Sequence, residues 1–422
     1  MASSRSRKNA IKNLKNARRL KKDEFYTQFS DIQKELEKYL DYDPNTFRNK
    51  VVYCNCDDPF ESNFFRYFIL NFKRLGLKQL ITASYKPSTV ANTQLELFGN
   101  NKINKKSQSA KKITANKLII NQVHDMVRDG EFNLKDVTKQ LKKNKNNEWT
   151  PLEGDGDFRS EECINLLNLS DIVVTNPPFS LFIPFIKQLF EYKKNFLIIG
   201  NINCLSYKEI FPQIRKNKIW VGNGMGRWIS GFIVPKSYDL YGKEVRIDDE
   251  GNRIVATNNC LWLTNLDHGR RHQPLSLMTM KDNLKYSKHK DIRGKKKYDK
   301  YDNYEAIEVP FTDAIPSDYD GVMGVPITFL DKYNPKQFEI LGNSNVTGER
   351  EHLMNNVKRP SNCTYINSKP QFARILIRSK NKIWKLKEME ADHVSAWSKG
   401  GSSLLKNCEM LCKTHNLAKG NR

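Results

Sequence analysis

The order of apolar and polar positions in the first part of the chain predicts strands that alternate with helices. Residues 51–56 form a short apolar run, which is typical of a buried strand. Residues 80–85 have the same pattern, and apolar side chains recur at helical spacing between the two runs. A strand, a helix and a strand in this order indicate parallel strands with helices on the faces of the sheet.

A second unit of the same kind follows a long insertion. Residues 86–150 are rich in Lys and Asn and are expected to form an insertion with one or two helices. The core pattern resumes at 154–158, and residues 170–175 form the next predicted strand. A helical stretch over 182–190 leads to another predicted strand at 195–200. We therefore expect an α/β fold with a mostly parallel sheet.

The pattern changes from about residue 205 to 342, where short strands, aromatic residues and turns indicate a second subdomain. The basic stretch 281–300 is expected to be a flexible loop within it. Residues 222–226, Gly-Asn-Gly-Met-Gly, look like a nucleotide-binding loop. A strand pattern follows them, however, where a phosphate site needs a helix N-terminus. We therefore expect a hairpin turn at this position.

The net charge of the chain indicates what kind of partner it binds. The 422 residues include 71 Lys and Arg against 47 Asp and Glu, which gives a formal net charge of +24. The positive electrostatic field of such a chain favours a polyanionic partner, and nucleic acid is the first candidate. The alternative is a Lys-rich surface with no nucleic-acid role. A chain of this length also exceeds one ordinary core, so two or more domains are expected.

No targeting or membrane segment is predicted. Residues 1–22 are basic and polar, and no apolar run approaches the roughly 18 residues that would suggest a membrane span. This basic leader is either a disordered arm or a helix that contacts phosphates. The 8 cysteines form no CxxC pair and are expected to be reduced thiols. We therefore expect a soluble cytoplasmic protein.

Asn176-Pro177-Pro178-Phe179 is the sharpest motif, because it follows a predicted parallel strand and open α/β sheets bind ligands at that edge. An exocyclic adenine amine is a poor nucleophile, since its lone pair is delocalised into the ring. Hydrogen bonds from the amine to the Asn176 side chain and the Pro177 carbonyl would free that lone pair for attack on a methyl group. Phe179 would stack on a flipped base. The alternative for so short a motif is a rigid turn.

With this motif the chain resembles the EcoRI family of N6-adenine methyltransferases, which take their methyl group from S-adenosylmethionine. The resemblance covers roughly residues 20–380. It rests on the segments 23–28, 53–65, 171–179 and 324–335.

The resemblance implies a methyl-donor pocket formed by the first strand, turn and helix. Tyr26 and Thr27 would close one side of this pocket, and Asp155 or Asp157 would reach the adenine of the cofactor. The residues of the turn that would line the pocket are Asp57, Asp58, Pro59 and Phe60.

The turn departs from the family pattern in one respect. Glu61 and Asn63 stand where small residues of a glycine-rich turn are expected. The alternative role for Asp57 and Asp58 is to cap the helix that follows, since carboxylates are favoured at a helix N-terminus.

A different signature marks the C-terminal end, where Asp392-His393, Asn407 and His415-Asn416 occur in the order and spacing of HNH endonucleases. The resemblance covers about residues 382–422 and implies a ββα-metal fold. His393 would be the general base that activates water, and Asp392 and Asn416 would bind one Mg²⁺. No CxxC pair precedes Asp392, so a structural zinc site is not expected. The segment is either a working nuclease or a fused remnant.

The predicted architecture is a Rossmann-like S-adenosylmethionine-dependent methyltransferase sheet with a target-recognition subdomain and a small C-terminal HNH-like segment. We expect a basic leader over 1–22 and a catalytic core over 23–204, with the insertion 86–150 inside it. A target-recognition and remaining methyltransferase region would cover 205–380, and the HNH-like segment 381–422.

The predicted function is site-specific N6-methylation of adenine in double-stranded DNA within a restriction-modification system. The protein would be a monomer and would work beside a cognate restriction endonuclease. One alternative is a bifunctional enzyme whose tail also cleaves DNA. A second is a protein glutamine methyltransferase, because a planar amide can occupy the same site. A third is a DNA-binding module without catalysis.

Overall fold

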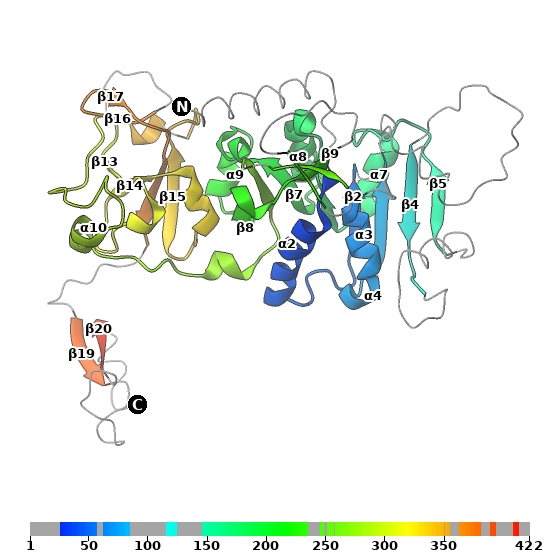
Figure 1. Cartoon of the computed structure of the whole chain (residues 1–422), viewed down its shortest axis with the longest axis horizontal. Coiled ribbons are helices and arrows are strands. Elements are labelled where there is room, and N and C mark those ends of the chain that lie inside the picture. Colours follow the sequence, from blue (N-terminus) through cyan, green and yellow to red (C-terminus); the bar gives the residue numbers. More distant parts are fainter. Residues whose placement is uncertain are drawn as a thin grey trace, which may run out of the picture. The chain divides into compact units, whose positions relative to one another are not determined.

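The chain divides into two compact units, whose elements are labelled in Figure 1. Unit 1 comprises Met1–Gln273, Ile327–Tyr333 and Asn345–Glu349, and unit 2 comprises the remaining segments. The computed structural model describes residues 26–56, 62–84, 115–124, 146–234, 245–248, 251–256, 258–349, 351–354, 363–380, 389–393 and 408–412.

Unit 1 is built around a sheet of eight strands in the order β5-β4-β3-β2-β6-β7-β12-β8. The four central strands, β3, β2, β6 and β7, are parallel, and the two outer strands on each side are antiparallel. The four strands expected from the sequence form this parallel centre and are confirmed, whereas the sheet as a whole is mixed. The strands are β2 (Val51–Asn55), β3 (Gln79–Ala83), β4 (Asn116–Ile120), β5 (Glu148–Pro151), β6 (Ile172–Thr175), β7 (Asn195–Asn201), β8 (Trp220–Met225) and β12 (Cys260–Thr264).

The outer strands come from segments that were not expected to join the sheet. The described parts of the insertion 86–150 contain β4 and β5, and no helix is found in those parts. On the other side, β12 and β8 extend the sheet beyond residue 204. The sheet thus continues past residue 204, and the functional boundary expected there stays a prediction.

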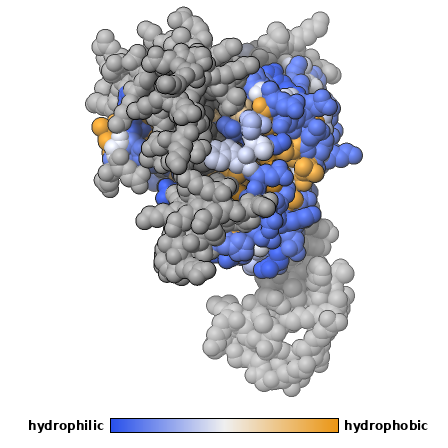
Figure 2. Space-filling model, turned by 90° about the vertical axis from the view of Figure 1, so that its right-hand side faces the viewer, coloured by the Kyte–Doolittle hydropathy of each residue, from blue (hydrophilic) through white to orange (hydrophobic). Residues whose placement is uncertain are grey.

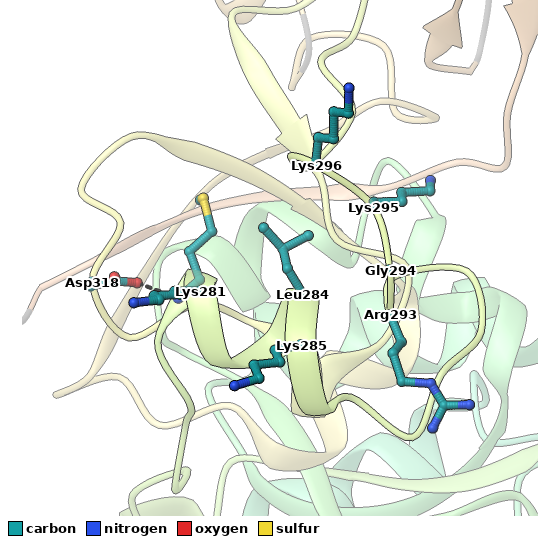
Figure 3. A pocket seen from close by; sticks show the side chains of 9 residues that line it. Lys281, Leu284, Lys285, Arg293, Gly294, Lys295, Lys296 and Asp318 are labelled. Carbon is teal, nitrogen blue, oxygen red and sulfur yellow. Dashed lines mark hydrogen bonds between the residues drawn. The ribbon is translucent and has the colours of Figure 1, made fainter.

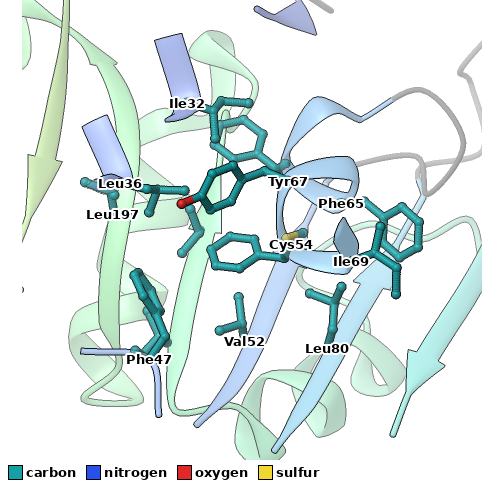
Figure 4. Close-up of a cluster of buried hydrophobic side chains, with 14 of the residues drawn as sticks. Ile32, Leu36, Phe47, Val52, Cys54, Phe65, Tyr67, Ile69, Leu80 and Leu197 are labelled. Atoms are coloured by element: carbon teal, nitrogen blue, oxygen red, sulfur yellow. The ribbon is translucent and has the colours of Figure 1, made fainter. Parts of the chain in front are cut away.

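Helices cover both faces of the parallel strands (Figure 1). Val52 and Cys54 of β2 pack in one cluster with Leu36 of α2 and Ile69 of α3, which Figure 4 shows from close by. The alternate residue Tyr53 contributes to the opposite face, where α7 contacts β2 and α8 contacts β7. The helices are α2 (Phe29–Tyr42), α3 (Asn63–Leu70), α4 (Phe72–Leu75), α7 (Glu161–Leu169), α8 (Phe182–Glu191) and α9 (Phe211–Arg215).

A second, small sheet of unit 1 has the strand order β1-β9-β11-β10, and all its pairs are antiparallel. Its strands are β1 (Tyr26–Thr27), β9 (Phe232–Val234), β10 (Val245–Ile247) and β11 (Arg253–Val255). Short 3-10 helices in the same unit are η1 (Phe179–Leu181), η2 (Ile202–Ser206), η3 (Gly226–Trp228), η4 (Gly269–His272) and η6 (Ile327–Lys332).

Unit 2 contains a four-stranded sheet in the order β13-β14-β18-β15. Beside it, Arg374 is buried and binds both oxygens of Glu308, with Nη2 2.6 Å from Oε1 and Nε 3.2 Å from Oε2. The elements of this unit are α10 (Met280–Tyr286), β13 (Ala306–Glu308), η5 (Thr312–Ala314), β14 (Val322–Val325), β15 (Phe338–Asn343), η7 (Glu351–Leu353), β16 (Tyr365–Ile366), β17 (Lys369–Pro370), β18 (Ile375–Ser379), β19 (Met389–His393) and β20 (Cys408–Cys412).

The basic stretch 281–300 was expected to be a flexible loop, and this expectation is wrong. Its first residues belong to α10, and the rest is anchored by Ile292 and Tyr298, which are 3% and 5% exposed. The Tyr298 hydroxyl also donates to the Ala314 carbonyl at 2.7 Å. Apolar anchors spaced along a charged segment fix it to the body of unit 2.

On the face that Figure 2 shows, most of the described residues are hydrophilic, with smaller hydrophobic patches among them. Within the described part of the chain, no helix is long and apolar enough to cross a membrane.

Two buried carboxylates on α2 fix the segment between β8 and β9. Glu35 is fully buried and accepts hydrogen bonds from the Asn223 backbone N–H at 2.8 Å and from the Trp228 indole N–H at 2.7 Å. Asp31, one turn earlier, accepts from the backbone N–H and the hydroxyl of Ser230, both at 2.9 Å. Burial raises the pKa of both carboxyl groups, and the bound donors offset part of that cost.

The glycines of the motif at 222–226 make room for the contacts of Glu35 and Trp228. The motif is not a hairpin turn as expected, since residues 220–225 form strand β8. A Cβ on Gly222 would lie 2.3 Å from Oε1 of Glu35, and one on Gly224 would lie 2.5 Å from the Trp228 ring. Glycine is therefore required where the strand passes close to the α2 carboxylate and to the indole.

Glu35→Ala is expected to lower the free energy of unfolding by about 2–4 kcal/mol, because the N–H donors of Asn223 and Trp228 lose their acceptor. Urea denaturation measures the change. Asp41→Ala is the matched control, since Asp41 lies on the same helix with a side chain that is 63% exposed, and its urea midpoint should equal that of the unsubstituted protein. Equal midpoints for the two variants would contradict the role given to Glu35.

Candidate active site

The carboxyl ends of β2 and β6 are the candidate position for a ligand site in this sheet. These two strands are neighbours at the centre of the sheet, and the chain continues from β2 outward to β3 but from β6 outward to β7 on the other side. The strand order therefore reverses between β2 and β6, which is the position where open α/β sheets bind their ligands. The motif 176–179 directly follows β6 at this edge, as expected.

A hydrogen bond ties the ends of the two strands together. The Thr175 hydroxyl donates to the backbone carbonyl of Asn55, and both residues are buried. The Asn55 side-chain Nδ2 is buried and has no partner among the described residues. Cys56 then adopts a left-handed conformation with φ of 69°, which is uncommon for a residue that carries a side chain. The chain thus leaves the sheet abruptly after Asn55.

The turn that follows contains Asp57, Asp58, Pro59 and Phe60, which lie outside the described residues together with Glu61. The start of α3 is described, and its N-cap is Ser62, whose hydroxyl accepts from the backbone N–H groups of Phe64 and Phe65 at 3.1 and 3.3 Å. The N-cap position of this helix is therefore taken by Ser62 and not by Asp57 or Asp58.

Asn63 explains part of the departure from a glycine-rich turn. Its side-chain Nδ2 donates to the Thr27 carbonyl at 2.8 Å, so the start of α3 is bound to strand β1. Thr27 itself is 3% exposed, and its hydroxyl has no partner among the described residues. Tyr26 and Thr27 thus lie beside the first residues of α3, where the sequence predicted one wall of the donor pocket.

The aromatic end of the motif meets the same small sheet. The Phe179 ring packs against Phe232 of β9, with ring centroids 6.1 Å apart and an angle of 68° between the planes. Phe232 is the register partner of Thr27. Strand β9 therefore links the predicted base-stacking residue to the predicted donor wall, although these segments lie far apart in the sequence.

The first three residues of the motif form a bent exit from β6. Pro177 is buried, whereas Asn176, Pro178 and Phe179 are half-buried at the edge of the sheet. The Pro178 carbonyl accepts from the Leu181 N–H at 2.9 Å and begins η1. A proline at 177 and at 178 removes two N–H donors, so this exit presents carbonyl oxygens without competing amides.

Asp155 and Asp157 lie in a tight loop beside the end of β3. Gly156 between them has φ of 77°, and a Cβ there would lie 2.0 Å from the Ser84 carbonyl oxygen. Asp157 pairs with Arg159 at 2.5 Å, and this guanidinium lowers the pKa of its carboxyl group. Asp155 is exposed, and its Oδ1 accepts from the Asp157 N–H at 3.0 Å. The loop is thus held against the strand next to β2.

The part of the C-terminal segment that is described contains two antiparallel strands, β19 and β20, with His393 level with Cys408. Asp392 and His393 are the last two residues of β19. Asn407 and Asn416 lie outside the described residues, as does the helix expected after the second strand. The antiparallel pair of β19 and β20 corresponds to the two strands with which a ββα arrangement begins.

The sequence predicted the motif and the candidate turn, but it did not reveal the contacts of Asp31 and Glu35 on α2 or the position of β9 beside the motif. A signal for the burial of these two carboxylates was present in the sequence. Asp31 and Glu35 are four residues apart, so they lie on one face of the helix, and each stands next to an apolar residue of the buried face, Ile32 or Leu36. No local signal marks Phe232 as a neighbour of Phe179, since the two residues meet only through the tertiary fold.

The chain is similar to known proteins over most of its length. The family model described as adenine-specific methyltransferase EcoRI matches residues 13–380, and an HNH endonuclease model matches 378–422. The Type II methyltransferase M.EcoRI of Escherichia coli is 45% identical over 368 residues, which are 87% of this chain and 96% of that protein. The Type II methyltransferase M.MpnI of Mycoplasma pneumoniae is 35% identical over 77% of this chain and 83% of its own length.

A third relative, the Type II methyltransferase M.MgeORF184P of Mycoplasma genitalium, is 33% identical over 86% of this chain and 97% of its own length. No solved structure matches the chain. The extent of these matches shows that the chain belongs to the EcoRI family of adenine-specific DNA methyltransferases, which use S-adenosylmethionine, and that it carries an HNH domain at its C-terminus.

Proposed function

We propose that this protein methylates N6 of an adenine flipped out of its DNA recognition site, with Asn176-Pro177-Pro178-Phe179 as the amine-binding site. The observation that carries the proposal is the position of this motif directly after β6, where the strand order of the parallel sheet reverses. Ligand sites of open α/β sheets occur at this position, and the motif supplies the oxygen acceptors that an amine requires.

In this proposal the Asn176 side-chain oxygen and the Pro177 carbonyl each accept a hydrogen bond from the adenine amine. Both bonds favour a pyramidal nitrogen and localise its lone pair for attack. The Phe179 ring stacks on the base and offsets part of an unstacking cost of a few kcal/mol. S-adenosylmethionine, when bound, supplies a sulfonium methyl: the S–C bond breaks, an N–C bond forms, and the nitrogen loses a proton.

The donor pocket is proposed beside the amine site, between β1, the turn after β2 and the loop 155–157. Its buried polar atoms fit a polar ligand, because the Thr27 hydroxyl and Asn55 Nδ2 are buried without a partner among the described residues. Tyr26, Thr27 and the turn residues Asp57, Asp58, Pro59 and Phe60 would hold the donor. Asp155 is the better candidate of the two loop carboxylates, since Asp157 is paired with Arg159.

The functional division of the chain is also part of the proposal. The region 23–204 would be the catalytic core and 205–380 would contain target recognition, with 1–22 as a basic leader and 381–422 as the nuclease-like segment. The relatives are Type II methyltransferases, which supports a restriction-modification role beside a cognate restriction endonuclease. We propose that a monomer acts on cellular DNA in the cytoplasm.

The HNH domain supports a second activity. We propose that Asp392 and Asn416 bind one Mg²⁺ and that His393 activates the water that attacks a phosphodiester. The match of this segment to the HNH endonuclease model favours a bifunctional enzyme over the protein glutamine methyltransferase that was the other alternative. Such a chain would both modify and cleave DNA.

Asn176→Ala is expected to reduce methyl transfer at least about a hundredfold, because one of two acceptors for the reacting amine is lost. Transfer of label from S-adenosylmethionine to N6-methyladenine in unmethylated plasmid measures the rate, and calorimetry should show unchanged donor binding. Asn203→Ala, which alters an exposed residue just past the end of β7, is the control and should keep full activity. An active Asn176→Ala variant would refute the assignment.

Gly156→Ala is expected to weaken S-adenosylmethionine binding and to lower stability by about 1–3 kcal/mol, because the added Cβ forces the loop away from Ser84. Gly154→Ala is the matched control in the same loop, since a Cβ there meets nothing within 4 Å. Calorimetric titration and thermal melting measure the two effects. If both variants bind the donor equally well, the loop 155–157 does not belong to the donor pocket.

His393→Ala is expected to abolish Mg²⁺-dependent strand breaks in plasmid and to leave methyl transfer unchanged, because the two activities use separate residues. Both products are followed in the same reaction with and without Mg²⁺. Breaks that persist in the variant would exclude His393 as the general base, and loss of methylation would show that the tail takes part in the main site.

A further inference from the structure

Unit 2 carries a hollow with a volume of about 740 Å³ that is lined mainly by basic residues. Figure 3 shows Lys281 and Lys285 leaving α10, Arg293 and Lys296 leaving the loop that follows, and Leu284 between them. None of these residues belongs to the active site described above. The hollow therefore needs an explanation of its own.

The cations of the hollow are held on a fixed backbone. The Gly294 N–H donates to the Leu284 carbonyl at 2.8 Å, which binds the loop directly to α10. Asp318 Oδ1 accepts from the Met280 N–H at 2.6 Å and fixes the start of the helix. Together with the buried anchors Ile292 and Tyr298, these bonds hold the side-chain origins in place. The backbone that carries these charged side chains is therefore ordered before a ligand binds, which lowers the entropic cost of binding.

The charge of the hollow is strongly unbalanced. Its lining contains five Lys and Arg residues and one carboxylate, Asp318, which gives 5 − 1 = +4. Lys295 pairs with Asp299 at 2.6 Å, but Lys281, Lys285, Arg293 and Lys296 form no ion pair with a described residue. All four are exposed. Like charges that are gathered in this way favour a ligand with several negative charges.

The chemistry of the lining distinguishes a phosphate backbone from other anions. Long, exposed Lys side chains and one Arg suit phosphates, which they can contact at variable positions. The apolar part of the lining is Met280 and Leu284, and the lining contains no aromatic anchor of the kind that protein interfaces use. It also lacks the Asn or Gln side chains that bind the edge of adenine. The hollow is therefore suited to phosphates, and contacts to phosphates carry no direct sequence information.

We propose that this hollow binds the sugar–phosphate backbone of duplex DNA and adds sequence-independent affinity for the substrate. The proposal rests on the proposed function in one respect, namely that duplex DNA is the substrate. Each phosphate contact releases a condensed counterion, so the hollow makes binding steeply dependent on salt.

The test compares two triple variants that each remove two Lys and one Arg from unit 2. The hollow variant is Lys281→Ala, Lys285→Ala and Arg293→Ala, and the control variant is Lys336→Ala, Lys369→Ala and Arg378→Ala. All six residues are exposed. Fluorescence anisotropy of a short labelled duplex of arbitrary sequence gives the binding constant between about 50 and 200 mM salt.

The hollow variant is expected to bind at least tenfold more weakly, and the plot of log K against log salt concentration should lose about 2–3 units of slope, at roughly 0.9 per phosphate contact. The control variant should keep the slope of the unsubstituted protein. Equal slopes or equal losses in the two variants would overturn the proposal. So would weaker binding to single-stranded RNA with duplex DNA binding unchanged.

Methyl transfer separates this proposal from the proposed function. At saturating plasmid the hollow variant should transfer methyl groups at the unsubstituted rate, because its three side chains lie outside the catalytic residues. If the unsubstituted protein labels no adenine, the proposed function fails. If it labels adenine and the hollow variant binds DNA as the control does, only the proposal for the hollow fails.

Discussion

The structure of unit 1 depends on the pairing of β2 with β6. These parallel strands are joined at their carboxyl ends by the bond from the Thr175 hydroxyl to the Asn55 carbonyl, and the chain leaves them toward opposite edges of the sheet. Side chains that follow the two strands must therefore approach each other, whatever their separation in sequence. Because the buried Thr175 hydroxyl finds its hydrogen-bond acceptor only in this alignment, the bond favours the observed register of β2 and β6.

The second constraint is the burial of two carboxylates on α2. Burying charge is costly unless hydrogen bonds compensate it, and here backbone and indole donors from the segment 223–230 do so. The same bonds determine where β9 begins, and β9 pairs with β1 and presents Phe232 to Phe179. The two buried carboxylates of α2 thus help to position Phe232 and the neighbouring strand β1, which is the predicted wall of the donor pocket.

The candidate active site and the proposed phosphate-binding hollow differ in their chemistry. The candidate active site consists of oxygen acceptors, prolines and aromatic rings, and few of its described residues carry charge. The hollow of unit 2, in contrast, is lined by five basic residues of α10 and the loop after it, on a backbone held by hydrogen bonds and buried anchors. Phosphate contacts that do not read sequence and base contacts that do can in this way be supplied by different segments.

The sequence by itself determined the parallel strands, the helices between them and the motif at the end of β6, because period and turn residues are local properties. It also contained enough family signal to place the chain among adenine methyltransferases and to find the HNH segment. Only the tertiary structure decided that β4 and β5 of the insertion join the sheet, that the glycines at 222 and 224 accommodate Glu35 and Trp228, and that residues 281–300 are anchored. These features arise where segments far apart in the chain meet, as in the bond from Ser230 to Asp31 across 199 residues, and local periodicity carries no information about such encounters.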